Sequence, residues 1–167
     1  MTVSAMSLAA FNDADQDDAV RFLAQACEAP HWARRVAALR PFATVDELCE
    51  QAAAELAATD DADIRAGLAG HPRIGEPVGE GRSATEQSRV AAADDAARAR
   101  LVEANRAYEE RFGHVYLVFA HGRGAEELLA ILEQRLGNDP DVEWRVARTE
   151  LCRITEFRLA AMVEAES

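Results

Sequence analysis

The sequence predicts an all-α protein, and its composition and punctuation both support that fold class. Alanine, the residue with the highest helix propensity, supplies about one residue in five, whereas aromatic residues make up only 6%. Pro, Gly and capping residues divide the chain into segments of helical length. The 167 residues suffice for one hydrophobic core without disulfides or metals. We therefore expect a single-domain bundle of about seven to nine helices over residues 1–167, with residues 1–10 as a mobile N-terminus.

In the N-terminal part, capping residues predict where helices begin. Asp13 followed by Gln16 resembles a capping box, and Thr44 with Glu47 is a second one. Pro30 suits the first turn of a helix. The expected helices run from about Asp15 to Cys27, from Pro30 to Leu39, from Thr44 to near Thr59 and from Asp63 to Ala69.

In the C-terminal part, a long loop interrupts the helical pattern. The sequence HPRIGEPVGEGR, residues 71–82, carries two prolines and three glycines, and loops of this length are often functional. Ser83 with Glu86 is a third capping box and opens a helix that reaches about Arg111. HVYLVFA, residues 114–120, is apolar on every side, so its periodicity fits a buried strand-like segment or a helix turn. Further helices are expected from Ala125 to Leu136 and from about Val142 to Met162.

Charge and composition exclude several classes of function. The formal net charge of −12 disfavours nucleic acid and anionic membrane surfaces as partners. All 18 basic residues are arginine, which excludes a pyridoxal phosphate Schiff base, a lysine-bound biotin and a lysine-dependent P-loop. The three cysteines lack CxxC spacing, and no histidine pair has metal-ligand spacing, so we expect no metal site and a reduced, cytoplasmic protein. No signal peptide or membrane span is expected either.

Two residues near the long loop are candidates for acid and base chemistry. His71 stands between the end of a helix and Pro72, where an imidazole with a near-neutral pKa could transfer protons; the alternative is a structural or surface histidine. Glu86 lies at the third position of a predicted helix, where it can serve as a capping residue, as a catalytic carboxylate held ionised by the helix terminus, or as both.

Several strings along the chain together resemble one known family. They are RPF (40–42), HPRIGE (71–76), SATEQ (83–87), NRAYEERFG (105–113), VFAHGR (118–123), RLGND (135–139) and ExxxIxxxRL (150–159). In this order and spacing, from about Phe11 to Leu159, they resemble the 2-oxo-4-hydroxy-4-carboxy-5-ureidoimidazoline (OHCU) decarboxylases. That resemblance implies a cofactor-independent carboxy-lyase of urate catabolism that forms (S)-allantoin.

The resemblance also implies a fold, an assembly and a set of site residues. The fold is an all-helical domain, usually a homodimer, that needs no cofactor or metal. His71 and Glu86 are implied as catalytic residues. The implied substrate-binding residues are Pro72, Ser83, Gln87, Arg158 and the main chain of Tyr116, Leu117, Val118, Phe119 and Ala120. The alternatives are a non-catalytic helical interaction module and a family member that has lost its activity.

Overall fold

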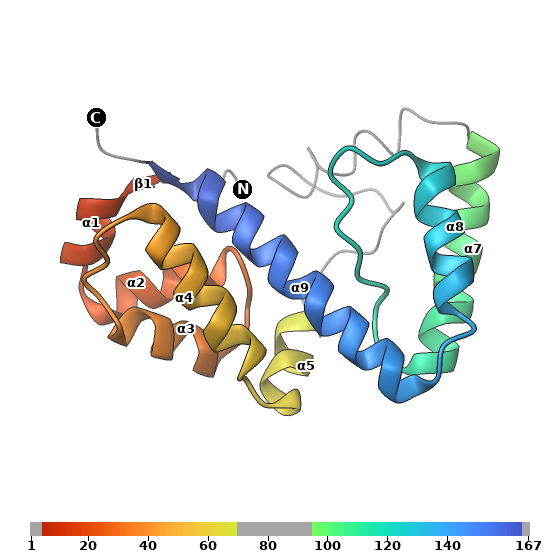
Figure 1. The fold of residues 1–167 in the computed structure, drawn as a ribbon, viewed down its shortest axis with the longest axis horizontal. Coiled ribbons are helices and arrows are strands. Elements are labelled where there is room, and N and C mark those ends of the chain that lie inside the picture. The colour runs from red at the N-terminus through yellow and green to blue at the C-terminus, as the bar shows by residue number, and fades with distance from the viewer. Residues whose placement is uncertain (1–4, 70–94, 165–167) are drawn as a thin grey trace. The chain divides into compact units, whose positions relative to one another are not determined.

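The computed structural model describes residues 5–69 and 95–164, and this part of the chain forms eight α-helices and one pair of two-residue strands. The expected all-α class is confirmed (Figure 1). The chain divides into two compact units, which are described separately here. The described residues of unit 1 are 95–151, and those of unit 2 are 5–69 and 152–164.

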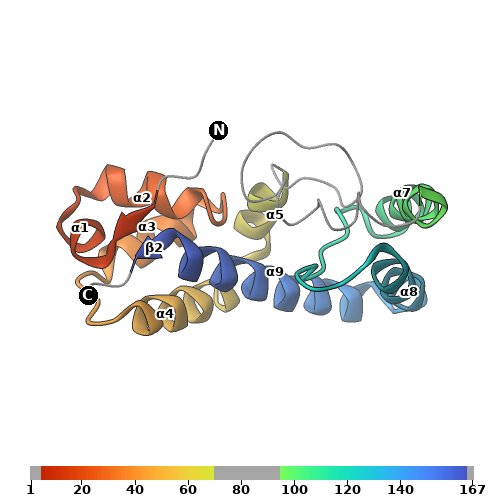
Figure 2. The ribbon, with the colours of Figure 1, turned by 90° about the horizontal axis from the view of Figure 1, so that it is seen from above.

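Unit 2 contains the N-terminal helices and the last part of the chain. Its helices are α1 (Leu8–Asp13), α2 (Gln16–Ala24), α3 (Pro30–Ala38), α4 (Val45–Ala57), α5 (Asp61–Ala69) and the second half of α9 (Pro140–Met162). Strand β1 (Met6–Ser7) pairs in parallel with β2 (Val163–Glu164), which follows directly after α9 (Figure 2). In the described part of residues 1–10, Met6–Ser7 forms β1 and α1 begins at Leu8, while the mobility expected of residues 1–10 stays a prediction.

Three helix starts in unit 2 are capped by a nearby side chain; one is the predicted start and two depart from the prediction. Thr44 is the N-cap of α4, where its hydroxyl accepts the Glu47 N–H at 3.0 Å, which confirms the expected cap. The Glu47 carboxylate accepts the Ala43 N–H at 2.7 Å rather than that of Thr44, so the return bond of the box is shifted by one residue. The box expected at Asp13 is wrong, because Asp13 ends α1 and Asp15 caps α2 by accepting the Asp18 N–H at 2.8 Å. α5 begins two residues earlier than expected, where Asp60 accepts the Asp63 N–H at 2.9 Å.

The core of unit 2 is built around aromatic side chains from separate elements. The ring of Phe11 lies 5.6 Å from that of Phe22 and 6.3 Å from that of Phe42. Trp32 is fully buried, and its Nε1–H donates to the Ala52 carbonyl of α4 at 2.9 Å. These contacts join α1 to α2 and to the loop at Phe42, and they join α3 to α4.

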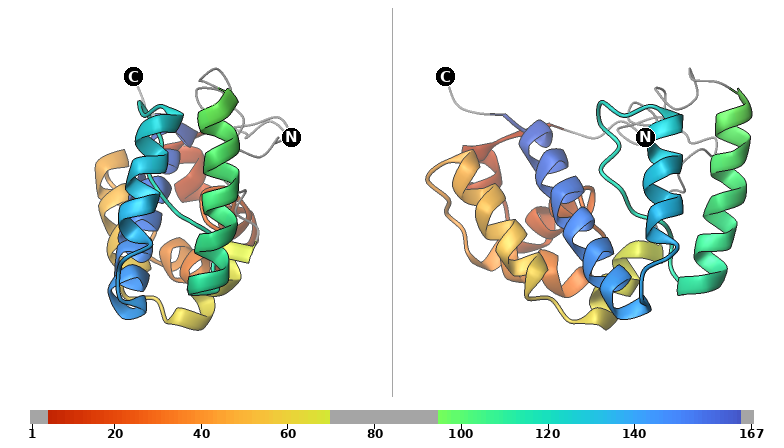
Figure 3. Two further views of the ribbon diagram at one scale, coloured as in Figure 1. Left: turned by 90° about the vertical axis from the view of Figure 1, so that its right-hand side faces the viewer. Right: turned by 45° about the vertical axis from the view of Figure 1, so that its right-hand side comes forward.

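Unit 1 is formed by α7 (Asp95–Phe112), α8 (Ala125–Arg135) and the first half of α9. Helices α7 and α8 run side by side in both views of Figure 3. A shared core lies between them and the segment 115–120; its fully buried members include Leu101, Tyr108, Tyr116, Leu128 and Leu132. The three helices match the expected ones closely, although residues 83–94 of the expected helix to Arg111 lie outside the described residues.

No helix in the described ranges 5–69 and 95–164 is long and apolar enough to cross a membrane.

Candidate active site

The predicted site residues fall into three groups in the structure. His71, Pro72, Ser83, Glu86 and Gln87 lie outside the described residues. The segment from Tyr116 to Ala120 belongs to unit 1, and Arg158 belongs to unit 2.

Residues 115–120 form neither a strand nor a helix turn. They are an irregular part of the chain that connects α7 to α8 (Figure 1). Glycines in the left-handed region stand at both ends of it. Gly113, with φ +78°, ends α7 by donating its N–H to the Glu109 carbonyl at 2.8 Å. Gly122, with φ +81°, lies in a turn where the Arg123 N–H donates to the Ala120 carbonyl at 3.0 Å. Only glycine adopts such backbone angles without strain, so these turns set where the segment starts and stops.

The side chains of this segment are part of the core. Tyr116, Val118 and Ala120 pack in the unit 1 cluster, and Leu117 is also buried. The Tyr116 hydroxyl donates to the Leu128 carbonyl at 3.1 Å. Burial raises the pKa of Tyr116 well above its usual range, so the hydroxyl keeps its proton and acts as a donor. Side-chain packing therefore fixes the path of the segment and leaves its main chain to make polar contacts.

Some main-chain groups of the segment form hydrogen bonds with charged side chains, whereas others form none. The Leu117 carbonyl accepts from Nη1 of Arg135 at 2.6 Å, and the Phe119 N–H donates to Oε1 of Glu150 at 3.4 Å. The N–H groups of Leu117, Val118 and Ala120 donate no hydrogen bond to any atom in the described part of the chain. Buried N–H groups in proteins are nearly always paired, so these three donors, which belong to buried residues on the two sides of Phe119, are candidates for hydrogen bonds to a ligand carbonyl.

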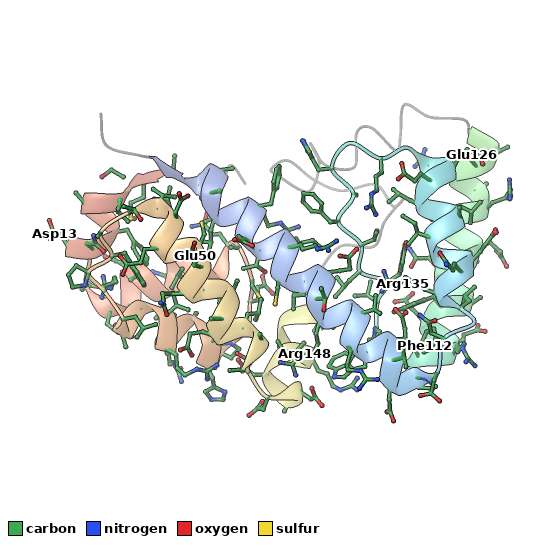
Figure 4. The ribbon with its side chains drawn as sticks, in the orientation of Figure 1. Asp13, Glu50, Phe112, Glu126, Arg135 and Arg148 are labelled. Carbon is green, nitrogen blue, oxygen red and sulfur yellow. The ribbon has the colours of Figure 1, made fainter. Side chains whose placement is uncertain are left out.

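Arg135 belongs to a buried charged cluster that joins α7, α8 and α9. Nη2 of Arg135 lies 2.5 Å from Oε2 of Glu143, and Nε contacts both carboxylate oxygens at 3.1 and 3.0 Å. The Tyr108 hydroxyl donates to Oε2 of Glu143, and Nδ2 of Asn138 donates to Oε1 at 3.1 Å. Figure 4 labels Arg135 near the C-terminal end of α8.

The Arg135 guanidinium and the Tyr108 hydroxyl of this cluster both keep their protons. Burial by itself lowers the pKa of the Arg135 guanidinium, but the hydrogen bonds and negative charge of Glu143 raise that pKa above its ordinary value. Burial, and then the hydrogen bond to Glu143, raise the pKa of Tyr108 far above its usual range. Arg135 is therefore a permanent cation and Tyr108 a permanent donor, and neither can serve as a base near neutral pH.

Arg158 lies on the second half of α9 and is buried in unit 2. Its Nη1 is 3.4 Å from the Ala26 carbonyl, just after α2. The Cys27 thiol is also in this region; burial raises its pKa, which the charge of Arg158 opposes. The cationic head of Arg158 is thus enclosed by protein rather than extended into solvent.

The sequence analysis gave no site role to Arg135, Glu143 or Glu150, although all three contact or support the segment. Arg135 begins the string RLGND and Glu150 begins ExxxIxxxRL, but these strings served only to identify the family resemblance. A usable signal was the placement of Arg135 and Glu143 on either side of the turn between two helices, which brings opposite charges together. The described residues contain no group of His, Cys, Asp and Glu side chains able to hold a metal ion.

Comparisons with known proteins identify one family. The sequence model of the OHCU decarboxylases matches residues 12–160. The 2-oxo-4-hydroxy-4-carboxy-5-ureidoimidazoline decarboxylase of Haloferax volcanii is 30% identical over 96% of this chain and 98% of its own length. The uric acid degradation bifunctional protein TTL of Arabidopsis thaliana is 36% identical over 55% of this chain, which corresponds to 31% of the plant protein. A crystal structure of OHCU decarboxylase in the presence of (S)-allantoin superposes with a TM-score of 0.74 and 29% identity, covering 82% of this chain and 93% of that one.

Proposed function

This chain belongs to the OHCU decarboxylase family, and from that premise we propose that it converts 2-oxo-4-hydroxy-4-carboxy-5-ureidoimidazoline to (S)-allantoin and CO2. The observation that carries the proposal is the extent of the family match, from residue 12 to residue 160. Because that match runs through both compact units, we propose that they form one OHCU decarboxylase domain. The homodimer and the cytoplasmic location expected from the resemblance are part of the same proposal, and light scattering on the purified protein tests the first.

The chemistry requires positioning and one directed proton. The substrate carries a carboxylate and a hydroxyl on one carbon of its ring, next to the conjugated part of that ring. When the bond to the carboxylate breaks, CO2 leaves and the electron pair stays on the ring carbon, where the ring delocalises it. The carbon that lost CO2 keeps its oxygen and becomes a carbonyl carbon of allantoin as its hydroxyl proton leaves. A proton delivered to one face of the neighbouring ring carbon, which carries the ureido group, then gives a single enantiomer. A site that excludes water and holds the carboxylate perpendicular to the ring favours this sequence.

Each catalytic role is assigned by the family resemblance. His71 orients the substrate and delivers the proton, and Glu86 fixes the imidazole tautomer or accepts a hydrogen bond from the substrate hydroxyl. Pro72, Ser83 and Gln87 shape the pocket, and Arg158 is the substrate-facing arginine.

The main chain of residues 116–120 is the substrate-binding element for which the described structure offers direct support. The unused N–H groups of Leu117, Val118 and Ala120 suit the carbonyl oxygen of a ureido group. The Phe119 N–H already donates to Glu150, so we assign binding to its neighbours rather than to the whole segment.

The experiment compares the protein with a His71→Asn variant. The labile substrate is generated from urate by oxidation and ring hydrolysis, and its ultraviolet decay is followed together with the circular dichroism of the allantoin formed. We expect the wild-type protein to accelerate the decay and yield optically pure (S)-allantoin. His71→Asn should lower kcat by about 10² to 10⁴-fold.

The matched control is His121→Asn, the same substitution at an exposed histidine in unit 1, which should keep wild-type kinetics. A folded His71→Asn variant with near-normal turnover would remove the catalytic assignment. Spontaneous decay with racemic product in the wild-type protein would instead support an inactive member or an interaction module.

A further inference from the structure

The buried cluster around Arg135 and Glu143 has no part in the chemistry proposed above, yet it joins three helices among the described residues of unit 1. Arg135 is 6% exposed and Glu143 is fully buried. The Glu143 carboxylate accepts hydrogen bonds from Arg135, Tyr108 and Asn138. Among the described contacts of the guanidinium, Nε and Nη2 are used on Glu143, and Nη1 is used on the Leu117 carbonyl at 2.6 Å.

Stability alone is a weak reason for such a pair. Removing two charges from water costs several kcal/mol per ion, and well-packed apolar replacements of buried ion pairs are often as stable or more so. The Tyr116 ring lies 4.9 Å from the guanidinium and the Tyr108 ring 5.9 Å, which gives the cation favourable π contacts but does not by itself require a cation. The contact to the Leu117 carbonyl is different, because only a long side chain with several donors can make it while also binding Glu143.

That contact controls a neighbouring donor because the peptide unit is planar. The Leu117 carbonyl and the Val118 N–H belong to the same trans peptide, so they point in opposite directions. When Arg135 holds the carbonyl, it also sets the direction of the Val118 N–H. The segment has no helix or sheet ladder that would set this direction otherwise.

We propose that Arg135, held in place by Glu143, is a positioning residue that aims the Val118 main-chain N–H at the ureido carbonyl of the ligand. The inference rests on the proposed substrate class. It concerns the binding of the ureido group and not the proton transfer, because Arg135 acts through the Leu117 peptide and contacts no reacting atom.

The ureido carbonyl that the Val118 N–H would bind forms and breaks no bond in the reaction, and this determines the expected kinetics. A contact to such a group is made in the ground state and in the transition state alike, so its loss raises KM and leaves kcat nearly unchanged. A partly unfolded enzyme behaves differently, since it lowers the apparent kcat and keeps KM.

The experiment uses the double variant Arg135→Met/Glu143→Gln, which removes both charges together and keeps an acceptor for the Tyr108 hydroxyl. We expect KM to rise by about 10-fold, the equivalent of one hydrogen bond, with kcat within about 3-fold of wild type. Arg135→Lys retains a cation but has one donor nitrogen in place of the three that Arg135 uses, so it should give an intermediate KM.

The matched control is Arg100→Met/Glu133→Gln, which neutralises an exposed pair of the same residue types on α7 and α8. It should leave KM unchanged. Isothermal titration with (S)-allantoin, which contains the ureido group, provides a readout independent of turnover. The dissociation constant should rise by about 10-fold in the double variant and stay constant in the control.

A folded double variant that has the same KM and the same affinity for (S)-allantoin as the wild type would overturn the inference. A loss confined to kcat would overturn it as well. If the wild-type protein binds (S)-allantoin but does not accelerate decarboxylation, the proposed activity fails, and the titration alone then decides the role of Arg135.

Discussion

The N-terminus of α3 depends on a carboxylate supplied by another helix, and removing that carboxylate is the sharpest stability test of unit 2. Ala29 occupies the N-cap position and has no side-chain acceptor, while Pro30 fills the first turn. Asp63 of α5 takes over the capping role: its Oδ1 accepts the His31 N–H at 3.2 Å and its Oδ2 accepts the Trp32 N–H at 3.1 Å.

The structure allows the cost of Asp63→Ala to be worked out. A capping side chain contributes about 1 kcal/mol, and the charge of the carboxylate at the positive end of the helix adds to this. Asp63 and Trp32 are both buried, so the Trp32 N–H would lose its acceptor without gaining water, at a further cost of about 1 to 2 kcal/mol. We expect the free energy of unfolding to fall by about 2 to 4 kcal/mol.

Urea denaturation followed by far-ultraviolet circular dichroism measures this change. Asp63→Asn keeps one carbonyl oxygen and should lose about half as much stability as Asp63→Ala. The control is Asp61→Ala, the same substitution two residues earlier at an exposed position of α5, which should cost at most about 0.5 kcal/mol. If Asp63→Ala were no more destabilising than Asp61→Ala, capping by Asp63 would be refuted.

Three further predictions concern single side chains. Burial raises the pKa of the Cys49 thiol to about 11. As the pH rises, the thiol therefore ionises in the unfolded chain before it does in the folded protein, so stability is lost. Between pH 9 and 11 the free energy of unfolding of the wild type should fall more steeply than that of Cys49→Ala, by up to about 1.4 kcal/mol per pH unit. Urea titrations over this pH range measure both curves, and parallel curves would contradict the prediction. Trp32→Phe loses the hydrogen bond to Ala52 and part of a buried ring, so calorimetry should show about 1 to 3 kcal/mol of destabilisation, and a change below about 0.5 kcal/mol would be inconsistent with that packing. Glu86→Ala should lower kcat and also cost about 1 kcal/mol; a thermal effect with intact kinetics would leave Glu86 only its capping role.

The parts of the fold that depend on neighbouring residues were predictable. Thr44 and Glu47 lie three residues apart, and the hydrogen bond from the Glu47 N–H to the Thr44 hydroxyl needs no distant partner, so the start of α4 followed directly from the sequence. The ends of the expected first helix were less accurate because distant contacts intervene there. Asn12 exchanges two hydrogen bonds with the main chain of Phe42, both at 2.9 Å, and this anchors α1 just before the chain turns into α2.

In the candidate site, too, the local features were predictable and those that depend on distant residues were not. The string HVYLVFA predicted a buried segment, but the pattern of its apolar residues did not predict that the backbone would be irregular there. That conformation depends on Arg135 and Glu150, which come from separate helices and whose partners are main-chain groups. Similarly, Asp63 is an ordinary first-turn acid by sequence and becomes a cap for α3 only through tertiary contact.

The stereochemistry of the product tests the central claim most directly. With substrate generated in place from urate, circular dichroism should show only (S)-allantoin, forming faster than the spontaneous reaction and in proportion to the amount of protein added. Racemic allantoin that appears at the same rate with and without the protein would contradict the account.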